Sequence, residues 1–325
     1  VNSINIGRIA AQAVYYVWSW LRVTDAVEEG RRAGYRIDVC VPSGNFGNIY
    51  AGFLARSMGV PIRRLILATN ENNVLEEFFT TGIYRPRSAE DTLATSSPSM
   101  DISKASNLER FIWALLGPEV FVQRWAELET TGTLDLRDQL PRLREEFGFA
   151  AGTSTHADRL EAIRSVKERS GRLIDPHTAD GVTVALRVME PGFPTLVMET
   201  AKAAKFPQTV AEALGSEPET PDVVADLLAR PQKVETIDNE EAPLRALIED
   251  DLRRLRDDEA VTADEPYDAP VFEDGIIAEI RLLHRPLDVR KEVERLEADG
   301  IVVHDAPYRH TLIDEARNGI GIIRC

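Results

Sequence analysis

The alternation of apolar and polar residues predicts an α/β protein, and its clearest unit lies between residues 36 and 68. Arg36 to Val41 (R-I-D-V-C-V) alternates and then becomes continuously apolar and β-branched, which is typical of a strand in a covered parallel sheet. Ile49 to Ser57 has apolar residues at helical spacing and is ended by Gly59 and Pro61. Ile62 to Ala68 again resembles a strand. The order strand, helix, strand predicts a βαβ unit with a right-handed crossover.

Helical periodicity dominates the rest of the first 255 residues. A long helix is expected near the start of the chain, with an apolar stripe from Ile6 to Leu21 and Asn2 or Ser3 as its N-cap. Further helices are expected at residues 70–79, 107–116, 119–129, 136–147, 157–170, 180–189, 207–214, 221–228 and 240–255. Strands are expected at 195–198 and 233–237, and a surface loop at 88–106. The pattern predicts an open parallel sheet with flanking helices.

Composition and pattern together divide the chain into three parts. Its 325 residues fit about two domains. We expect residues 1–250 to form a large domain and the acidic, proline-containing residues 251–274 to be a linker. Residues 275–325 read as a small α/β segment of unknown function, with strands at 275–283 and 301–304 around a helix at 287–298.

Charge and cysteine content exclude several classes of protein. A net charge of −16 argues against a nucleic-acid surface, which needs clustered Lys and Arg. No stretch approaches the length of a membrane span, and no signal peptide is evident, so we expect an acidic cytoplasmic enzyme. Only Cys40 and Cys325 occur, so no disulfide framework is expected. No metal site is expected either, because no carboxylate or cysteine lies at metal-ligand spacing from His156, His284, His304 or His310. Cys40, within a strand, reads as a small buried hydrophobe.

The loop between the first strand and the next helix carries the strongest chemical signal. It reads P-S-G-N-F-G-N, from Pro42 to Asn48, and lies at the carboxyl end of a strand, where open α/β sheets bind ligands. Gly44 and Gly47 permit left-handed backbone and close approach, so that amides from Ser43 to Asn48 can converge on an anion at a helix N-terminus. The alternative is an ordinary turn between strand and helix, since short glycine motifs are common.

Other candidate residues lie at similar corners. Thr200 follows the strand at 195–198, and its simplest role would be a helix cap. His177 lies just inside a helix start, with Asp175 as N-cap and Pro176 in the first turn, and a structural role is favoured over a catalytic one. Lys202 and Lys205 follow Thr200 and are either solvated or placed to meet a phosphate; no metal ligand is assigned.

An ordered series of motifs resembles the threonine synthase family over roughly residues 1–240. The series is V-N-S-I-N at 1–5, P-S-G-N-F-G-N at 42–48, A-T-N at 68–70, P-S-M-D-I at 98–102, S-N-L-E-R at 106–110, D-P-H-T-A at 175–179 and E-T-A-K-A-A-K-F at 199–206. The resemblance implies the tryptophan-synthase β-like fold, fold type II of the pyridoxal-phosphate (PLP) enzymes. It also implies a lyase of cytosolic threonine biosynthesis that converts O-phospho-L-homoserine and water to L-threonine and phosphate.

The resemblance also implies roles for individual residues. The cofactor phosphate would be held by the amides of the glycine-rich loop, and Thr200 would hydrogen-bond the pyridine nitrogen. The loop residues concerned are Gly44, Asn45, Phe46, Gly47 and Asn48. Asn2, Ser3 and Asn5 would lie near the substrate, although plain helix capping is nearly as good an interpretation.

The chain departs from the family pattern in one decisive respect. The Schiff-base lysine of the family belongs to an F-K-D type motif upstream of V-N-S-I-N, and none of the chain's lysines, at 104, 167, 202, 205, 233 and 291, has that context. No catalytic residue is therefore assigned. We expect a carboxy-terminal portion of a threonine synthase, incomplete at its N-terminus and inactive alone. Smaller departures are Leu108 in place of an aromatic residue and Asp180 in place of a small apolar one.

Two alternatives and one physical consequence follow. A related PLP lyase, such as a threonine or serine dehydratase, would share the phosphate loop but not the ordered series of motifs. A non-catalytic protein that binds phosphate or PLP would retain the loop alone. If a covering domain is missing, the first helix and the sheet around Val39 should expose apolar faces, which predicts aggregation or dimerisation.

Overall fold

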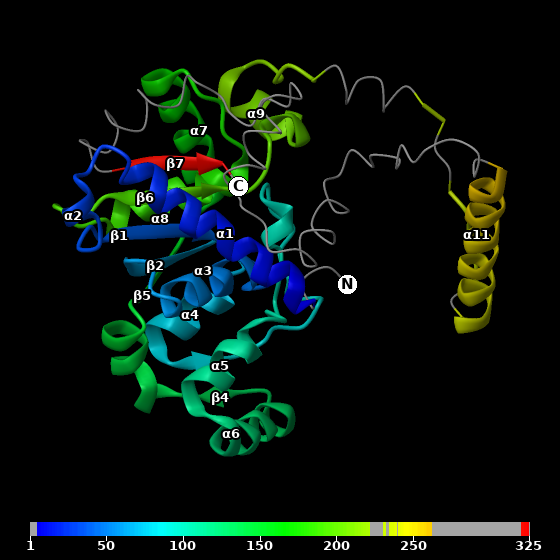
Figure 1. Cartoon of the computed structure of the whole chain (residues 1–325), viewed down its shortest axis with the longest axis horizontal. Helices are drawn as coiled ribbons and strands as arrows, with labels where there is room; N and C mark the ends of the chain where they lie inside the picture. Colours follow the sequence, from blue (N-terminus) through cyan, green and yellow to red (C-terminus); the bar gives the residue numbers. More distant parts are fainter. Residues whose placement is uncertain (1–4, 222–229, 232–233, 239, 262–319, 325) are drawn as a thin grey trace. The chain divides into compact units, whose positions relative to one another are not determined.

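A computed structural model of the chain describes residues 5–221, 230–231, 234–238, 240–261 and 320–324 (Figure 1). Contacts divide it into two units, Val1–Pro221 with Pro307–Cys325, and Asp222–Ala306. The candidate site lies in the first unit. None of the helices in the described ranges is long and apolar enough to cross a membrane.

The first unit is built on a parallel sheet of five strands in the order β5-β2-β1-β6-β7. The strands are β1 (Ile37–Pro42), β2 (Ile62–Thr69), β5 (Phe149–Thr153), β6 (Thr195–Glu199) and β7 (Ile320–Arg324). At the centre, Val39 of β1 pairs with Leu65 on one side and with Leu196 on the other. The predicted fold class, α/β with an open parallel sheet and flanking helices, is confirmed.

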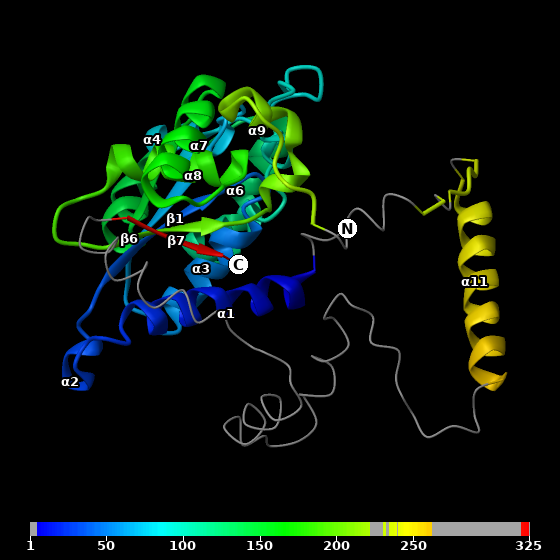
Figure 2. The same ribbon diagram turned by 90° about the horizontal axis from the view of Figure 1, so that it is seen from above.

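Helices cover both faces of this sheet (Figure 1 and Figure 2). One face packs against α1 (Ile6–Val23), α3 (Gly47–Ser57), α4 (Val74–Thr81) and α5 (Leu108–Leu116). The other packs against α7 (His156–Ser170), α8 (Pro176–Val188) and α9 (Pro207–Leu214). Successive residues of β1 alternate between the two cores, with Val39 and Val41 in one and Cys40 in the other.

The expected exposure of the sheet is therefore wrong, because Val39 is fully buried between the two helix layers. Cys40 is buried as expected, and its thiol donates to the Gly181 carbonyl oxygen at 3.2 Å. Exposure does occur on α1, whose outer side carries Val14 at 62% and Trp18 at 52% exposed.

The remaining elements connect these layers. They are α2 (Glu29–Arg32), α6 (Pro118–Thr131), the antiparallel pair β3 (Ile83–Tyr84) and β4 (Leu134–Asp135), and short 3-10 turns at Pro98–Met100, Arg137–Gln139 and Ala203–Lys205. A π turn spans Arg142–Glu146. In the second unit, the described helix is α11 (Glu241–Val261).

The structure corrects four expectations about elements. The helix expected at 136–147 is a 3-10 turn followed by a π turn, and Pro141 between them lacks the N–H that a continuous helix needs. The strand β5 lies where none was expected. Residues 234–237 form no strand. Helix α1 begins at Ile6 with Asn5 as N-cap, so neither Asn2 nor Ser3 caps it.

Much of the carboxy-terminal third lies outside the described residues. This holds for the helix expected at 221–228, for most of the expected linker and for the small α/β segment up to residue 319. Helix α11 runs into the first part of the expected linker, ending at Val261. At the end of the chain, β7 pairs in parallel with β6, Leu196 opposite Gly321, although no strand was expected there. The three-part division of the chain stays a prediction.

Candidate functional site

The glycine-rich loop links the carboxyl end of β1 to the N-terminus of α3, and Phe46 is its N-cap residue. Among the described residues, Phe46 is the one non-glycine with positive φ, at 64°. The expectation that Gly44 and Gly47 supply the left-handed conformation is therefore wrong. The Phe46 ring is fully buried, with its centroid 5.7 Å from that of Phe79 and 6.0 Å from that of Phe149. Burial of the ring in this aromatic cluster offsets the strain of a left-handed residue.

Gly44 shows the close approach that was expected of the glycines. A Cβ atom at Gly44 would lie 3.0 Å from the Ser99 carbonyl oxygen and 3.1 Å from Met100 Cα. At Gly47 the nearest atom, Asn107 Nδ2, would be 3.4 Å away, an ordinary contact. The backbone of the P-S-M-D-I segment thus packs directly onto Gly44, and only glycine fits there without displacement.

All but one of the backbone donors of the loop have no partner among the described residues. Ser43 N donates to the Ala68 carbonyl at 2.9 Å, as a continuation of the sheet. From Gly44 to Ile49, by contrast, no backbone N–H donates to an acceptor among the described residues. These amides lie at the N-terminus of α3, where the helix dipole favours negative charge. We call residues 43–49 the cradle, and its geometry suits a bound anion.

Two neighbouring elements fix the shape of the cradle. The Asn45 carbonyl accepts from the backbone N and from Nδ2 of Asn107, both at 3.1 Å. The Asn45 side-chain oxygen accepts from Ser106 Oγ at 3.2 Å. On the other side, the buried Tyr16 hydroxyl of α1 lies 2.8 Å from both the carbonyl and the side-chain oxygen of Asn48. The S-N-L-E-R motif and α1 therefore brace the two ends of the cradle.

Thr200 directly follows β6, the strand beside β1. Because Cys40 pairs with Val197, continuing the register brings Thr200 level with Ser43, at the same edge of the sheet as the cradle. Thr200 is exposed, and its hydroxyl has no hydrogen-bond partner among the described residues. The structure thus brings the two predicted corners to one edge, with the Thr200 side chain available to a ligand.

Of the three residues predicted to lie near the substrate, the structure describes Asn5 alone. Asn5 is exposed and accepts from Gly7 N at 2.9 Å, as the N-cap of α1. Asn2 and Ser3 lie outside the described residues. Lys202 and Lys205 are exposed, and no lysine among the described residues forms a hydrogen bond with the cradle.

Three motifs converge on the segment Thr95–Asp101. Asn70, from A-T-N, donates through Nδ2 to Thr95 Oγ1 and to Asp101 Oδ1, each at 2.8 Å. Asp101 Oδ2 accepts from Thr95 N at 2.9 Å and closes the segment on itself. The Ser, Thr, Asn and Pro residues of this region predict a loop. They do not predict that side-chain hydrogen bonds fix the loop at several points.

His177 holds the same segment from the side of α8. Ser99 N donates to His177 Nε2 at 3.1 Å, so Nε2 carries a lone pair and the proton lies on Nδ1. Nδ1 in turn donates to Asp175 Oδ1 at 2.8 Å, and Asp175 also caps the helix as expected. Both ring nitrogens are engaged within the protein, which supports the structural interpretation of His177.

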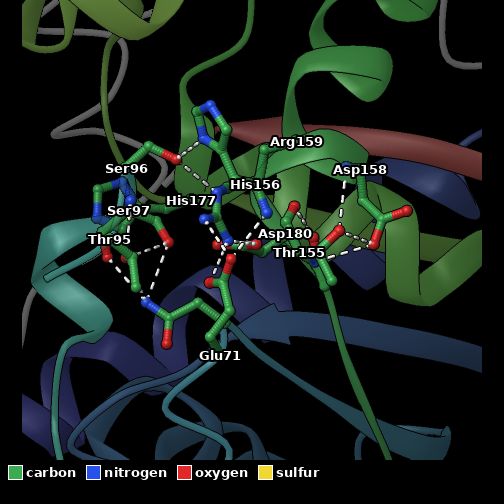
Figure 3. A network of polar contacts seen from close by, with 12 residues as sticks. Glu71, Thr95, Ser96, Ser97, Thr155, His156, Asp158, Arg159, His177 and Asp180 are labelled. Carbon is green, nitrogen blue, oxygen red and sulfur yellow. Dashed lines mark hydrogen bonds and ion pairs between the residues drawn. The ribbon is translucent and has the colours of Figure 1, made fainter. Parts of the chain in front are cut away.

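A buried ionic network that sequence reasoning missed lies behind this segment (Figure 3). Its centre is Arg159, which is fully buried. Arg159 donates to both Glu71 oxygens, at 2.9 and 3.0 Å, and to Asp180 Oδ1 at 3.0 Å. Nε donates to Ser96 Oγ at 2.7 Å, and that oxygen lies 2.8 Å from His156 Nδ1. The one signal in the sequence was Asp180, an unexpected charge at a position expected to be apolar.

The two carboxylates of the network differ in their electrostatics. Burial raises the pKa of Asp180 to about 6, against the opposing effect of Arg159, and its second oxygen has no hydrogen-bond partner among the described residues. Glu71 is less buried; burial acts to raise its pKa, but hydrogen bonds led by that from Arg159 leave the pKa lowered. Glu71 is therefore the principal counter-ion of Arg159.

Comparison with known proteins gives one consistent family. A family model described as "Threonine synthase, C-terminal" matches residues 178–248. The chain is 47% identical over 252 residues to the threonine synthase of Methylobacillus glycogenes, covering 76% of this chain and 52% of that protein. It is 49% identical over 257 residues to the Corynebacterium glutamicum enzyme, covering 77% and 52%.

Solved structures agree with these matches. The PLP-bound threonine synthase from Brucella melitensis superposes with a TM-score of 0.68 at 35% identity, covering 76% of this chain and 52% of that one. The yeast threonine synthase gives 0.68 at 29% identity, covering 78% and 53%. The fold is thus that of fold type II PLP enzymes, as predicted. The chain spans about half the length of the curated relatives it matches, and over that span it is similar to threonine synthases.

Proposed function

We propose that this chain forms the phosphate-binding side of a PLP-dependent lyase, a threonine synthase. Its reaction would convert O-phospho-L-homoserine and water to L-threonine and phosphate. The observation that carries the proposal is the row of backbone N–H groups from Gly44 to Ile49, at the N-terminus of α3, that have no acceptor in the part of the chain that the structure describes. The identity to threonine synthases and the PLP-bound structure of a relative support it.

The residues present fit the cofactor. The cradle amides would hold the phosphate, since they are donors that converge at a positive helix end. The free hydroxyl of Thr200, at the same edge of the sheet, would hydrogen-bond the pyridine nitrogen. When bound, PLP supplies an electron sink for carbanion chemistry. A neutral hydroxyl leaves that ring less protonated than a carboxylate would.

The remaining site residues would shape the wall of the site or approach the substrate. Both ring nitrogens of His177 are engaged, one by Asp175 and one by Ser99 N, so His177 would shape the wall of the site and take no part in proton transfer to substrate. Asn5, with Asn2 and Ser3, would approach the substrate. We further propose that the chain does not turn over substrate alone, because no lysine of the described residues forms a hydrogen bond with the cradle. We also propose that it acts in the cytoplasm, as the family resemblance implies.

The proposal predicts that the cofactor phosphate supplies much of the binding free energy, and a comparison of ligands with and without this group tests it. Fluorescence titration with PLP and with pyridoxal, which lacks the phosphate, should show at least tenfold tighter binding of PLP. The variant Gly44→Ala forces a Cβ against the backbone of Ser99 and Met100 and should weaken PLP binding at least tenfold. Gly30→Ala is the matched control, because a Cβ there meets nothing within 4 Å. Equal affinity for PLP and pyridoxal would contradict the proposal.

The reaction class is tested on the complete gene product. Release of phosphate from O-phospho-L-homoserine with formation of L-threonine would support a threonine synthase. Deamination of threonine or serine without that reaction would indicate a dehydratase. PLP binding without either activity would indicate a non-catalytic protein.

A further inference from the structure

The segment Thr95–Asp101 and the cradle are in direct backbone contact. The Cβ position of Gly44 lies 3.0 Å from the Ser99 carbonyl oxygen and 3.1 Å from Met100 Cα, so no atom fits between the two backbones. A shift of the segment therefore changes the space in which the cradle amides lie. Whatever fixes the segment also fixes the cradle.

The segment has three side-chain anchors, which come from different elements. Asn70, after β2, holds Thr95 and Asp101. His177, on α8, holds the backbone of Ser99. Arg159, on α7, holds Ser96 through a hydrogen bond of 2.7 Å from Nε to Oγ. Of these three anchors, Arg159 is the one that carries a formal charge, and charge-assisted hydrogen bonds are the stronger kind.

Arg159 also joins the other two anchors. Its main partner Glu71 is the neighbour of Asn70 in the chain, and its second partner Asp180 lies one helical turn from His177 on α8. The guanidinium thus connects the end of β2, α7, α8 and the segment through four hydrogen bonds from one rigid plane (Figure 3). A fully buried charge that spans these elements leaves them little freedom to move independently.

We infer that Arg159 is a positioning residue for the cradle, acting through Ser96 on the segment Thr95–Asp101. This inference rests on the proposed function only for the identity of the ligand that the cradle binds. The contact itself, and its effect on the cradle amides, is a property of the fold.

The sharpest variant is Ser96→Ala, because it removes the link between Arg159 and the segment while Arg159 keeps both carboxylates. Ser96→Thr retains a hydroxyl and serves as the conservative rescue. Ser88→Ala, in the same loop, is the matched control: Ser88 is exposed and its hydroxyl contacts Asp91, away from the network. Arg159→Lys, which keeps the buried charge but loses the planar fork, is a second test of the same link.

Amide hydrogen exchange, measured by mass spectrometry without cofactor, shows whether Arg159 and Ser96 hold the segment Thr95–Asp101 and the cradle in place. Ser96→Ala should speed exchange at least fivefold both in peptides covering residues 95–101 and in those covering the cradle and the first turn of α3, where Tyr50 N donates to the Phe46 carbonyl, with β1 and β2 unchanged. Ser96→Thr and Ser88→Ala should behave as wild type. Faster exchange in 95–101 with an unchanged cradle would overturn the inference, as would a uniform increase over the whole chain.

PLP titration of the same proteins separates this inference from the proposed function. With Ser96→Ala the dissociation constant should rise about tenfold, and with Ser96→Thr it should return to within twofold of wild type. If wild type binds no PLP but the exchange pattern is as expected, the proposed function fails and the positioning role stands. If PLP binds equally to all variants and cradle exchange is unchanged, the positioning role fails and the proposed function stands.

Discussion

At the residue scale, the left-handed Phe46 shows what local sequence can and cannot predict. The spacing of Gly44 and Gly47 was enough to predict an anion-binding corner between strand and helix. It assigned the left-handed conformation to the wrong residues, because that conformation depends on Phe46 packing against Phe79 and Phe149, which are distant in sequence. A tertiary contact here overrides a local preference.

Substitutions at Phe46 test this balance. Phe46→Ala should lower the free energy of unfolding by about 3–5 kcal/mol, because the ring leaves a cavity. Phe46→Gly loses the same ring but relieves the left-handed strain, so it should be more stable than Phe46→Ala by about 1 kcal/mol. Urea unfolding compares the two variants. A glycine variant less stable than the alanine variant would show that the backbone at position 46 is unstrained.

Asp180 should make stability depend on pH. Its pKa in the folded chain is about 6 and its ordinary value is 3.8, so folding favours the protonated form. The folded state gains from this proton below about pH 4, and the gain is lost as the pH rises towards and past 6. Between pH 4 and 7 the free energy of unfolding of wild type should fall, relative to Asp180→Asn, by at most about 3 kcal/mol. Parallel pH profiles for the two proteins, measured by urea unfolding, would contradict this.

At the element scale, strongly periodic segments were predicted well and weakly patterned ones were not. The βαβ unit and the helix over Pro176–Val188 follow from apolar periodicity, prolines and caps. Strand β5 (F-A-A-G-T) was missed because Ala and Gly have low strand propensity, and its pairing with β2 is what makes it a strand. The network around Arg159 was missed for a related reason: its members are far apart in sequence and meet only through the fold.

The packing of α1 on α3 supports the cradle and can be tested at Gly52. A Cβ there would lie 2.5 Å from Tyr16 Cε1 and 2.9 Å from Leu65 Cδ2, so the buried ring must move. Gly52→Ala should destabilise the chain by about 1–3 kcal/mol. It should also weaken PLP binding, since the Tyr16 hydroxyl contacts Asn48. Thermal unfolding and PLP titration measure both effects, with Gly30→Ala as control. An unchanged melting temperature would contradict the packing described here.

At the scale of the whole molecule, the exposed apolar side of α1 stands out on a chain with a net charge of −16. Val14, Trp18 and Leu21 follow one another at helical spacing and are all exposed, whereas the opposite side of the helix packs on the core. We expected exposed apolar faces on the first helix and on the sheet around Val39. The helix α1 has such a face, and the sheet does not.

This side of α1 should promote self-association. Sedimentation velocity over a range of protein concentrations should show dimers or larger species, increasing when salt screens the net charge. Replacing Val14 and Trp18 together by Glu should shift the distribution to monomer without lowering the melting temperature, since both side chains are at least half exposed. A wild-type monomer at all concentrations would contradict the prediction.

The most direct test of the account follows the amide protons of the cradle themselves. In a two-dimensional 15N–1H correlation spectrum, added PLP should shift the amide protons of residues 44–49 downfield, as donors to a phosphate do, and pyridoxal should not. Shifts confined to other parts of the chain, or identical shifts with both compounds, would contradict the claim that these unpartnered amides bind the cofactor phosphate.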